Sequence, residues 1–171
     1  MKINSLRELF QIELWYAYDC EQKLVDKGLP TMIENCSSPA LRRALENHLQ
    51  ETRGHVSKLE QIFTSTGIRA DTKSNAILKE ILSAAEDSID HTDVSPIRDA
   101  ALIINGNQVE HYEIALYGSL AALGRQLGLQ NEVKTLEAIL EEEKAADAKL
   151  TQIAESGVNT SAARESRAAS A

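Results

Sequence analysis

Residues 129–154 read LQNEVKTLEAILEEEKAADAKLTQIA. Residues of this segment that lie four and three positions apart in alternation form one stripe, which is the seam of a helix packed in a bundle. The stripe consists of Leu129, Val133, Leu136, Leu140, Glu143, Asp147, Leu150 and Ala154. The segment therefore predicts a bundle helix, with Glu143 and Asp147 at positions where a globular protein would ordinarily place Leu or Val.

The composition agrees with a helical bundle. The 171 residues are about one domain's worth of chain, long enough for a single core. They are 43% hydrophobic but only 4% aromatic, with 3 prolines, which favours helices over a β-sandwich or barrel. We predict an all-α protein.

Two long helices are expected in the first part of the chain. Apolar residues recur at helical spacing from Ser5 to about Asp26, where Gly28-Leu29-Pro30 interrupts the pattern, so we expect a kinked helix that resumes to Cys36. Ser38 is then a strong N-cap with Pro39 at the first helical position. The second long helix should end at Gly67.

The rest of the chain predicts a crossover and a second hairpin. Residues 77–91 form a shorter amphipathic pattern, after which Ser95-Pro96 repeats the helix start signal and Gly128 stops the third long helix. Two tight hairpins joined by a long connection with its own short helix make a ferritin-like four-helix bundle. We assign residues 1–156 to this domain and expect 157–171, rich in Ser, Ala and Arg, to be a disordered tail.

Charge and apolar patterning exclude several partners. A formal net charge of −8 repels nucleic acid and anionic lipid, so neither is expected as a partner. The N-terminus leads into an amphipathic helix without the apolar core of a signal peptide, and no segment approaches the roughly 18 apolar residues of a membrane span. The expected location is cytoplasmic, where Cys20 and Cys36 would be reduced thiols.

Acidic residues on the apolar stripes predict a metal site. Glu110 and Glu113 fall on the stripe of the third long helix, as Glu143 and Asp147 do on the fourth. A carboxylate removed from water costs several kcal/mol unless it is paired or ligates a metal. Ion pairing with Arg or Lys is the alternative, but no basic residue shares these stripes nearby. Their neighbours Glu141 and Glu142 are expected on a solvated face.

Distance from the turns indicates which acids share one level of the bundle. Glu143 and Glu113 are each 15 residues from Gly128, because helices of a hairpin advance at the same rise per residue. Around the turn at Ser37, the same comparison pairs Glu51 with Glu21 and disfavours Glu13.

Histidines could complete the ligand set. His48, Glu51 and His55 lie three and four residues apart, on one helix face. Either His48 or His55 could therefore ligate, whereas His111 should point away from the face of Glu110. Tyr117, one turn beyond Glu113, could hydrogen-bond a ligating carboxylate.

Several segments together resemble the YciE/YciF family of ferritin-like bacterial stress-response proteins. The most specific are RDAALI at 98–103, VEHYEIA at 109–115 and EEEKAAD at 141–147, supported by HLQET at 48–52 and LEQIF at 59–63. The resemblance runs from about residue 5 to 155. It implies a ferritin-like bundle, usually dimeric, related in architecture to rubrerythrin and manganese catalase.

The chain departs from the usual di-iron pattern, in which two helices each supply Glu-x-x-His. Here Glu51 is followed by His55 four residues later, and Glu143 is followed by Asp147 instead of His. Such an oxygen-rich set favours Mn, Mg or Ca more than an imidazole-rich site would.

The leading hypothesis is a dinuclear Fe or Mn site in a homodimeric stress protein that acts on peroxide. Its ligands would be drawn from Glu21, Glu51, Glu110, Glu113, Glu143 and Asp147, with His48 or His55. One alternative is a non-enzymatic stress protein whose metal is structural or stored. Another is a helical adaptor that uses Trp15, Tyr16 and Tyr18 as an interaction face.

Overall fold

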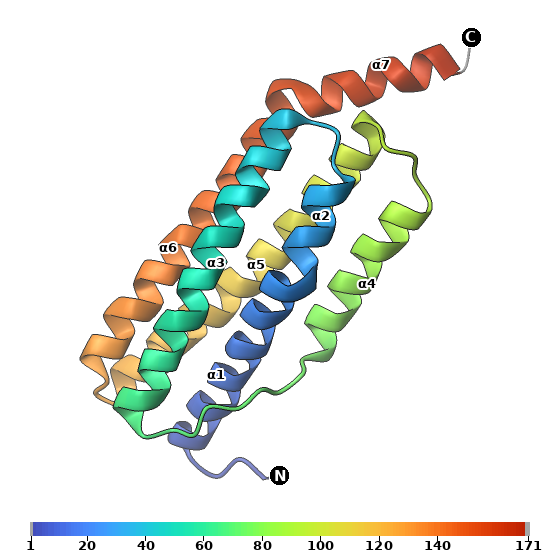
Figure 1. Ribbon diagram of the computed structural model, residues 1–171. Helices are drawn as coiled ribbons and strands as arrows, with labels where there is room; N and C mark the ends of the chain where they lie inside the picture. The colour runs from blue at the N-terminus through green and yellow to red at the C-terminus, as the bar shows by residue number, and fades with distance from the viewer. Residues whose placement is uncertain (1, 170–171) are drawn as a thin grey trace.

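The computed structural model describes residues 2–169, and its regular structure over this range is helical throughout. Figure 1 shows long rods that run side by side, as the sequence predicts for an all-α bundle. The first rod is continuous but has three parts, and the other three rods are single helices. These elements are α1 (Leu6–Lys23), η1 (Leu24–Gly28), α2 (Leu29–Asn35), α3 (Pro39–Thr66), α5 (Pro96–Gln126) and α6 (Gln130–Ile153).

Serine caps and left-handed glycines set the ends of these helices where the sequence places them. The Ser38 hydroxyl accepts a hydrogen bond from the Leu41 amide at 3.4 Å, and Ser95 caps α5 in the same way, each just before a proline. Gly67 and Gly128 have φ of 67° and 74°, a backbone conformation that glycine adopts without strain.

A π-helical turn, η1, stands where the sequence predicts a kink in the first rod. In η1 the Leu29 amide donates a hydrogen bond to the Leu24 carbonyl, five residues earlier, and Leu24 and Leu29 are both buried. The rod continues through Pro30, the second residue of α2, directly after the π-helical turn. The prediction that the helix resumes to about Cys36 is confirmed.

The connection between the two hairpins carries α4 (Ala76–Asp90), which lies along the outside of the bundle against α5 (Figure 1). It buries only Leu78 completely, as expected of a helix with one covered face. Four bundle helices with one long crossover form the ferritin-like arrangement that the sequence predicts.

The chain beyond residue 157 differs from the expected disordered tail. A second π-helical turn, η2 (Ala154–Val158), leads into α7 (Asn159–Ala169), which contacts α5 and extends from one end of the bundle (Figure 1). Val158 is buried in the core and anchors this connection. Val158 is the only large apolar residue in the sequence from 158 to 169, too little periodicity to reveal a helix. The tail's last two residues lie outside the described range.

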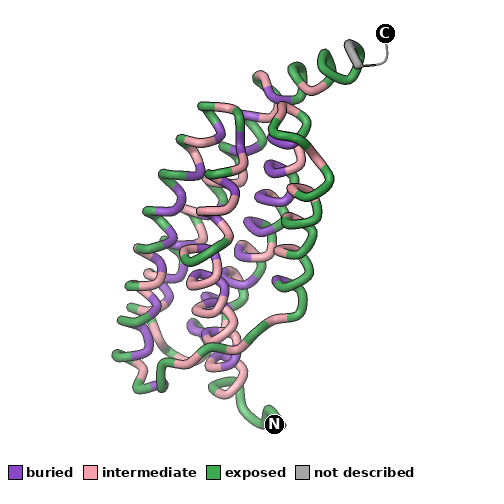
Figure 2. The backbone as a smooth tube through the Cα atoms, turned by 45° about the vertical axis from the view of Figure 1, so that its right-hand side comes forward, coloured by how far each residue is buried: buried purple, intermediate pink, exposed green. Residues whose placement is uncertain are grey.

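The core consists of two apolar clusters. Figure 2 shows the buried positions repeating along the inner sides of the rods. The cluster at the α2 end includes Leu29 and Leu45, and the cluster at the opposite end includes Phe10 and Leu136. In each of the four rods, buried polar or charged residues occur between the residues of these two clusters. The bundle thus has a polar level near its middle.

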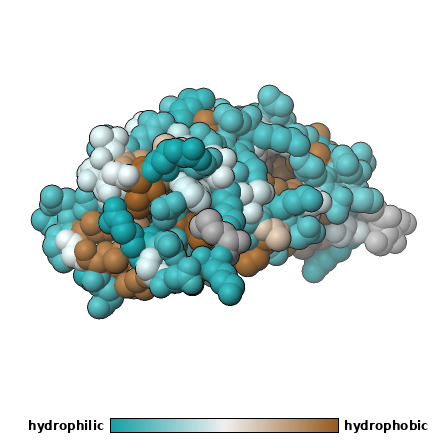
Figure 3. Space-filling model, turned by 90° about the horizontal axis from the view of Figure 1, so that it is seen from below, coloured by the Kyte–Doolittle hydropathy of each residue, from teal (hydrophilic) through white to brown (hydrophobic). Residues whose placement is uncertain are grey.

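The end of the bundle that carries the N-terminus is largely hydrophilic. Figure 3 views the bundle from the end that carries the N-terminus, and hydrophilic side chains cover most of that face, with hydrophobic ones in separate groups. Within residues 2–169, none of the helices is long and apolar enough to cross a bilayer.

Candidate metal centre

Six buried side chains meet between the two apolar clusters, and we call them the polar layer. Each of the four rods contributes at least one of them. They are Glu21 from α1, His48 and His55 from α3, Glu110 and Glu113 from α5, and Glu143 from α6. All six are at most 6% exposed. The sequence predicts every member of this layer, and the preference for Glu21 over Glu13 agrees with the structure.

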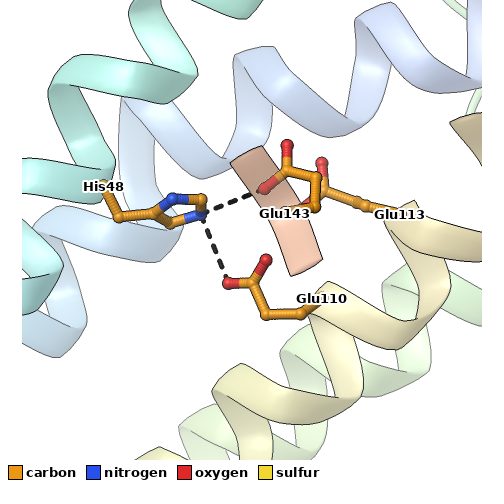
Figure 4. A group of neighbouring side chains, drawn as sticks. All are labelled: His48, Glu110, Glu113 and Glu143. Carbon is orange, nitrogen blue, oxygen red and sulfur yellow. Dashed lines mark ion pairs between the residues drawn. The ribbon is translucent and has the colours of Figure 1, made fainter. Parts of the chain in front are cut away.

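One half of the polar layer is the group of His48, Glu110, Glu113 and Glu143. Each offers one ligand atom, and these atoms lie within 4.8 Å of one another. Figure 4 shows the imidazole of His48 reaching from α3 toward the carboxylates of α5 and α6. Its Nε2 is 3.3 Å from Oε1 of Glu110 and 3.7 Å from Oε2 of Glu143.

The other half is formed by Glu21, His55 and Glu143. Nδ1 of His55 is 2.9 Å from Oε1 of Glu143 and 3.4 Å from Oε1 of Glu21. Glu143 therefore belongs to both groups, with one oxygen facing His48 and the other facing His55. A carboxylate in this position can bridge two ligand sets.

Many atoms of the polar layer have no hydrogen-bond partner. Both oxygens of Glu143 lack one, as do Nδ1 of His55 and Oε2 of Glu21, Glu110 and Glu113. Nδ1 of His55 and Oε1 of Glu143 are 2.9 Å apart, but they are not aligned for a hydrogen bond. Buried polar atoms are normally paired, so this many unpaired atoms in one place need an explanation. Their convergence fits a cation, which would ligate them.

The electrostatics also favour a cation. The ion pairs that the four carboxylates of the layer form within residues 2–169 involve only His48 and His55. Arg and Lys side chains therefore do not neutralise the layer, so the alternative of ion pairing with Arg or Lys is wrong. Two imidazoles, even if both are protonated, leave two negative charges uncompensated.

Protons partly replace the missing positive charge. Burial raises the pKa of Glu113 well above its usual range and that of Glu110 to about 7. Burial alone would lower the pKa of His55, but Glu143 and Glu21 outweigh it and raise that pKa to about 10. Because metal ligands must be deprotonated, a bound cation would displace these protons.

Both histidines direct their second ring nitrogen toward a carboxylate at the edge of the layer. Nε2 of His55 is 2.6 Å from Oε2 of Glu142, which also accepts a hydrogen bond from Lys58 at 2.7 Å. Nδ1 of His48 is 3.4 Å from Oε2 of Glu51. Metal-bound histidines almost always donate their free N–H to such a partner, which fixes the ring and its tautomer.

Glu51 and Glu142 therefore have different positions from those expected. The side chain of Glu51 is 50% exposed and lies behind His48, outside the polar layer, because it faces the outer edge of α3. Glu142 was expected on a solvated face, yet it contacts buried His55. The sequence contains no signal for this role, since Glu141 beside it has the same side chain and only pairs with Lys144.

Asp147 also lies outside the polar layer. Its Oδ1 accepts a hydrogen bond from Asn107 at 2.5 Å and is 3.2 Å from Nε2 of His111, at the outer edge of the contact between α5 and α6. The fully buried residues of α6 include Ile139, Glu143 and Leu150, so the inward stripe is rotated slightly from the expected one and leaves Asp147 at its side. His111 points away from the layer, as predicted.

Further contacts fix the carboxylates. The Tyr117 hydroxyl donates a hydrogen bond to Glu21, which confirms the prediction that this tyrosine contacts a layer carboxylate. The Cys20 thiol donates to Oε1 of Glu113 at 3.5 Å, a contact for which the sequence carries no signal. Glu21 and Glu113 are thus each held through one oxygen and unpaired at the other.

Comparison with known proteins identifies relatives of known structure. A family described as a domain of unknown function (DUF892) matches residues 5–163. Protein YciF of Escherichia coli K12 is 35% identical over 163 residues, which cover 95% of this chain and 98% of that protein.

Solved structures agree with this match. The structure of the E. coli stress protein YciF superposes with a TM-score of 0.85 at 35% identity, covering 92% of this chain and 99% of that chain. The protein YcfI from Rhodopseudomonas palustris has a TM-score of 0.83 at 34% identity, with 88% and 95% covered. A Xanthomonas campestris protein at 23% identity, with a TM-score of 0.75 over 95% of this chain and 99% of its own, shares the fold.

Proposed function

The chain belongs to the DUF892 family of domains of unknown function, and on that premise we propose that it is a stress protein that holds two redox-active metal ions in its polar layer and reduces peroxides. The stress role is suggested by its relative, the E. coli stress protein YciF. The metal role is supported by the unpaired buried atoms of four carboxylates and one imidazole.

The observation that carries the proposal is the position of Glu143. Its two oxygens face His48 and His55 from inside the bundle, and neither has a hydrogen-bond partner. Di-metal proteins of ferritin-like fold use four carboxylates and two histidines in all. The polar layer supplies the same number of each. They are distributed differently, because α3 provides both histidines and α5 provides two carboxylates.

The donor set suits Fe or Mn. Both metals accept carboxylate oxygen together with imidazole nitrogen, whereas a site selective for Mg or Ca would usually consist of oxygen alone. When bound, a pair of such ions supplies reversible electron exchange with peroxide oxygen, chemistry that no amino-acid side chain of the layer provides.

The residues of the chain position and insulate this chemistry. Glu142 and Glu51 orient the two imidazoles, and the Tyr117 hydroxyl holds Glu21 in place. The apolar clusters above and below the layer limit its contact with water, which strengthens the charge interactions within it. Glu142 and Lys58 also link His55 to the surface, which gives protons a route to the layer.

Metal analysis tests the proposal. Protein purified without chelators should contain up to two Fe or Mn per chain, and the loaded protein should consume peroxide. The double variant Glu110→Ala/Glu143→Ala should lose both properties. Glu46→Ala/Glu141→Ala is the matched control, since it removes two exposed acids from α3 and α6. Absence of metal from the wild-type preparation would refute the proposal, and tightly bound metal without turnover would favour a structural or storage site.

The adaptor alternative has less support. The Trp15 indole donates a hydrogen bond to the Arg69 carbonyl at 3.0 Å, and Tyr18 donates to Glu60 at 2.9 Å. Lys73 lies over the ring of Tyr16. These contacts involve α3 and the crossover segment of the same chain, so the aromatic residues have intramolecular partners.

We also propose that the protein is a homodimer. Ile77 of α4 and Ile104 of α5 are 61% and 60% exposed, and both line a shallow hollow with Ile81 and Tyr112. Subunit interfaces bury such side chains. Light scattering after gel filtration should give twice the mass of one chain, and Ile104→Asp should give monomers. A monomeric wild-type protein would refute this proposal.

A further inference from the structure

A cavity of about 290 Å³ lies directly beside the polar layer, on its α2 side. His48, Glu51 and Glu110 form its polar end. Its remaining interior wall is aliphatic and comes from the core cluster at the α2 end, with Leu24, Leu29, Met32, Leu45 and Leu150 among its members. The cavity therefore has one polar end next to the proposed metals and an apolar body that extends away from them.

The polar end contains a buried carboxylate next to a buried imidazole. The side chain of Glu110 is 97% buried, and its Oε1 is 3.3 Å from Nε2 of His48. His48 beside it is also buried, so both groups are fixed in place before any ligand arrives. A ligand with one hydroxyl-type group could donate a hydrogen bond to Glu110, while its hydrocarbon part fills the apolar body.

Small side chains create both the space and the entrance. Ala44 of α3 and Ala146 of α6 line the cavity where larger residues would close the gap between these helices. Gly106 lines the opposite wall, where a Cβ would be 2.8 Å from Leu150. Asn47 and Lys149 also line the cavity and are exposed, so it opens to solvent between α3 and α6.

The volume defines the class of ligand. An apolar cavity of about 150 Å³ accepts benzene, so one of about 290 Å³ has room for roughly ten to twelve non-hydrogen atoms. Hydrogen peroxide needs almost none of this space. The combination of a buried acceptor and an aliphatic body matches a medium-chain alkyl or an aryl-alkyl molecule with a single polar end.

We propose that this cavity binds the hydrocarbon group of an organic hydroperoxide, with the hydroperoxyl end at Glu110 and His48. The hydrocarbon part of this inference stands on the cavity alone, and the hydroperoxide part rests on the proposed function. In the overall reaction the O–O bond breaks: ROOH and two thiols, the reductant, give ROH, water and one disulfide.

Binding of 1-octanol, which resembles the alcohol product, tests the cavity without any turnover. Isothermal titration calorimetry on the metal-free and the metal-loaded protein should give one site per chain with a Kd on the order of 1 mM or tighter. 1,8-Octanediol, which has the same length, should bind about tenfold more weakly or worse, because its second hydroxyl would be buried among leucines.

Substitutions distinguish the cavity from other surfaces. Ala146→Leu should weaken octanol binding at least about tenfold by filling the space, and Ala44→Leu does the same from α3 if the first variant folds poorly by circular dichroism. Ala148→Leu makes the same change at an exposed position of α6 and should bind octanol like the wild type. Equal binding by all three variants, or no binding by the wild type, would overturn the proposal.

Kinetics then test the substrate class. With a dithiol as reductant, the metal-loaded Ala146→Leu variant should lower the ratio of kcat/KM for cumene hydroperoxide to kcat/KM for hydrogen peroxide at least about tenfold. An equal loss with both peroxides would overturn the assignment of the hydroperoxide. Failure of the proposed function is recognised separately, because octanol binding by metal-free protein does not depend on metal content.

Discussion

Replacing Glu143 by glutamine should change the stability of the metal-free and the metal-bound protein in opposite directions. Glu143 is fully buried, and neither of its oxygens has a hydrogen-bond partner. Three other carboxylates remain to face the two histidines after the substitution. The variant keeps the shape of the side chain and removes one negative charge from a layer that carries too many.

The magnitude follows from the buried atoms. A buried, unsatisfied polar group costs about 1–3 kcal/mol, and a charged one costs more. Glu143→Gln replaces a charged group by a neutral one and so gains the difference between these two costs. Part of that gain is lost because Glu143 lies close to His55, so we expect the variant to stabilise the metal-free protein by about 1–2 kcal/mol. In a chain of 171 residues this raises Tm by roughly 2–8 °C.

The metal-bound protein should respond in the other direction. Metal at a hundred times its Kd stabilises the wild type by about 2.7 kcal/mol, because it binds only the folded state. Glu143→Gln should lose most of this gain, since a neutral amide is a weaker metal ligand than a carboxylate.

Differential scanning calorimetry measures both effects, in EDTA and with added Mn²⁺. Glu141→Gln is the control, as this exposed neighbour only pairs with Lys144, and both of its values should stay within about 0.5 kcal/mol of the wild type. A metal-free Glu143→Gln protein that is clearly less stable than the wild type, yet gains as much from Mn²⁺, would refute the assignment of Glu143 as a strained ligand.

Three further predictions concern the same layer. Burial raises the pKa of Glu110 to about 7, and the metal binds the deprotonated carboxylate. Mn²⁺ affinity should therefore fall at least about tenfold from pH 8 to pH 6. A Kd that calorimetry finds to be independent of pH would contradict this prediction. Glu142→Gln should weaken metal binding about tenfold or more, because the His55 ring is then held less firmly. Competition with a chelator measures this affinity, and an unchanged value would show that Glu142 does not orient His55. Tyr117→Phe should destabilise the metal-free protein by about 1–3 kcal/mol in urea denaturation, since Glu21 loses its donor, and a neutral result would show that water replaces the hydroxyl.

Local signals explain why most of the fold could be predicted from the sequence. Ser38-Pro39 and Ser95-Pro96 start helices, and Gly67 and Gly128 end them, through contacts within a few residues of the chain. The C-terminal helix α7 was missed, because its attachment depends on Val158 contacting a distant part of the core.

The membership of the polar layer shows the limit of periodicity. Glu21, Glu110, Glu113 and Glu143 were found because acids on an apolar stripe are costly, whatever packs against them. Glu51 and Asp147 satisfy the same spacing but lie at the edges of their stripes, where a rotation of the helix by a few tens of degrees takes a side chain out of the core. Spacing along one helix does not determine that rotation.

The amino-acid sequence by itself determined the helices, their turns and the presence of excess negative charge inside the bundle, because these follow from contacts between near neighbours and from the cost of burying carboxylates. Only the tertiary structure decided that Glu142 contacts His55, that Glu143 faces both histidines and that a cavity lies beside Glu110. These features depend on how helices from distant parts of the chain are rotated and spaced, which is set by the packing of the whole core at once.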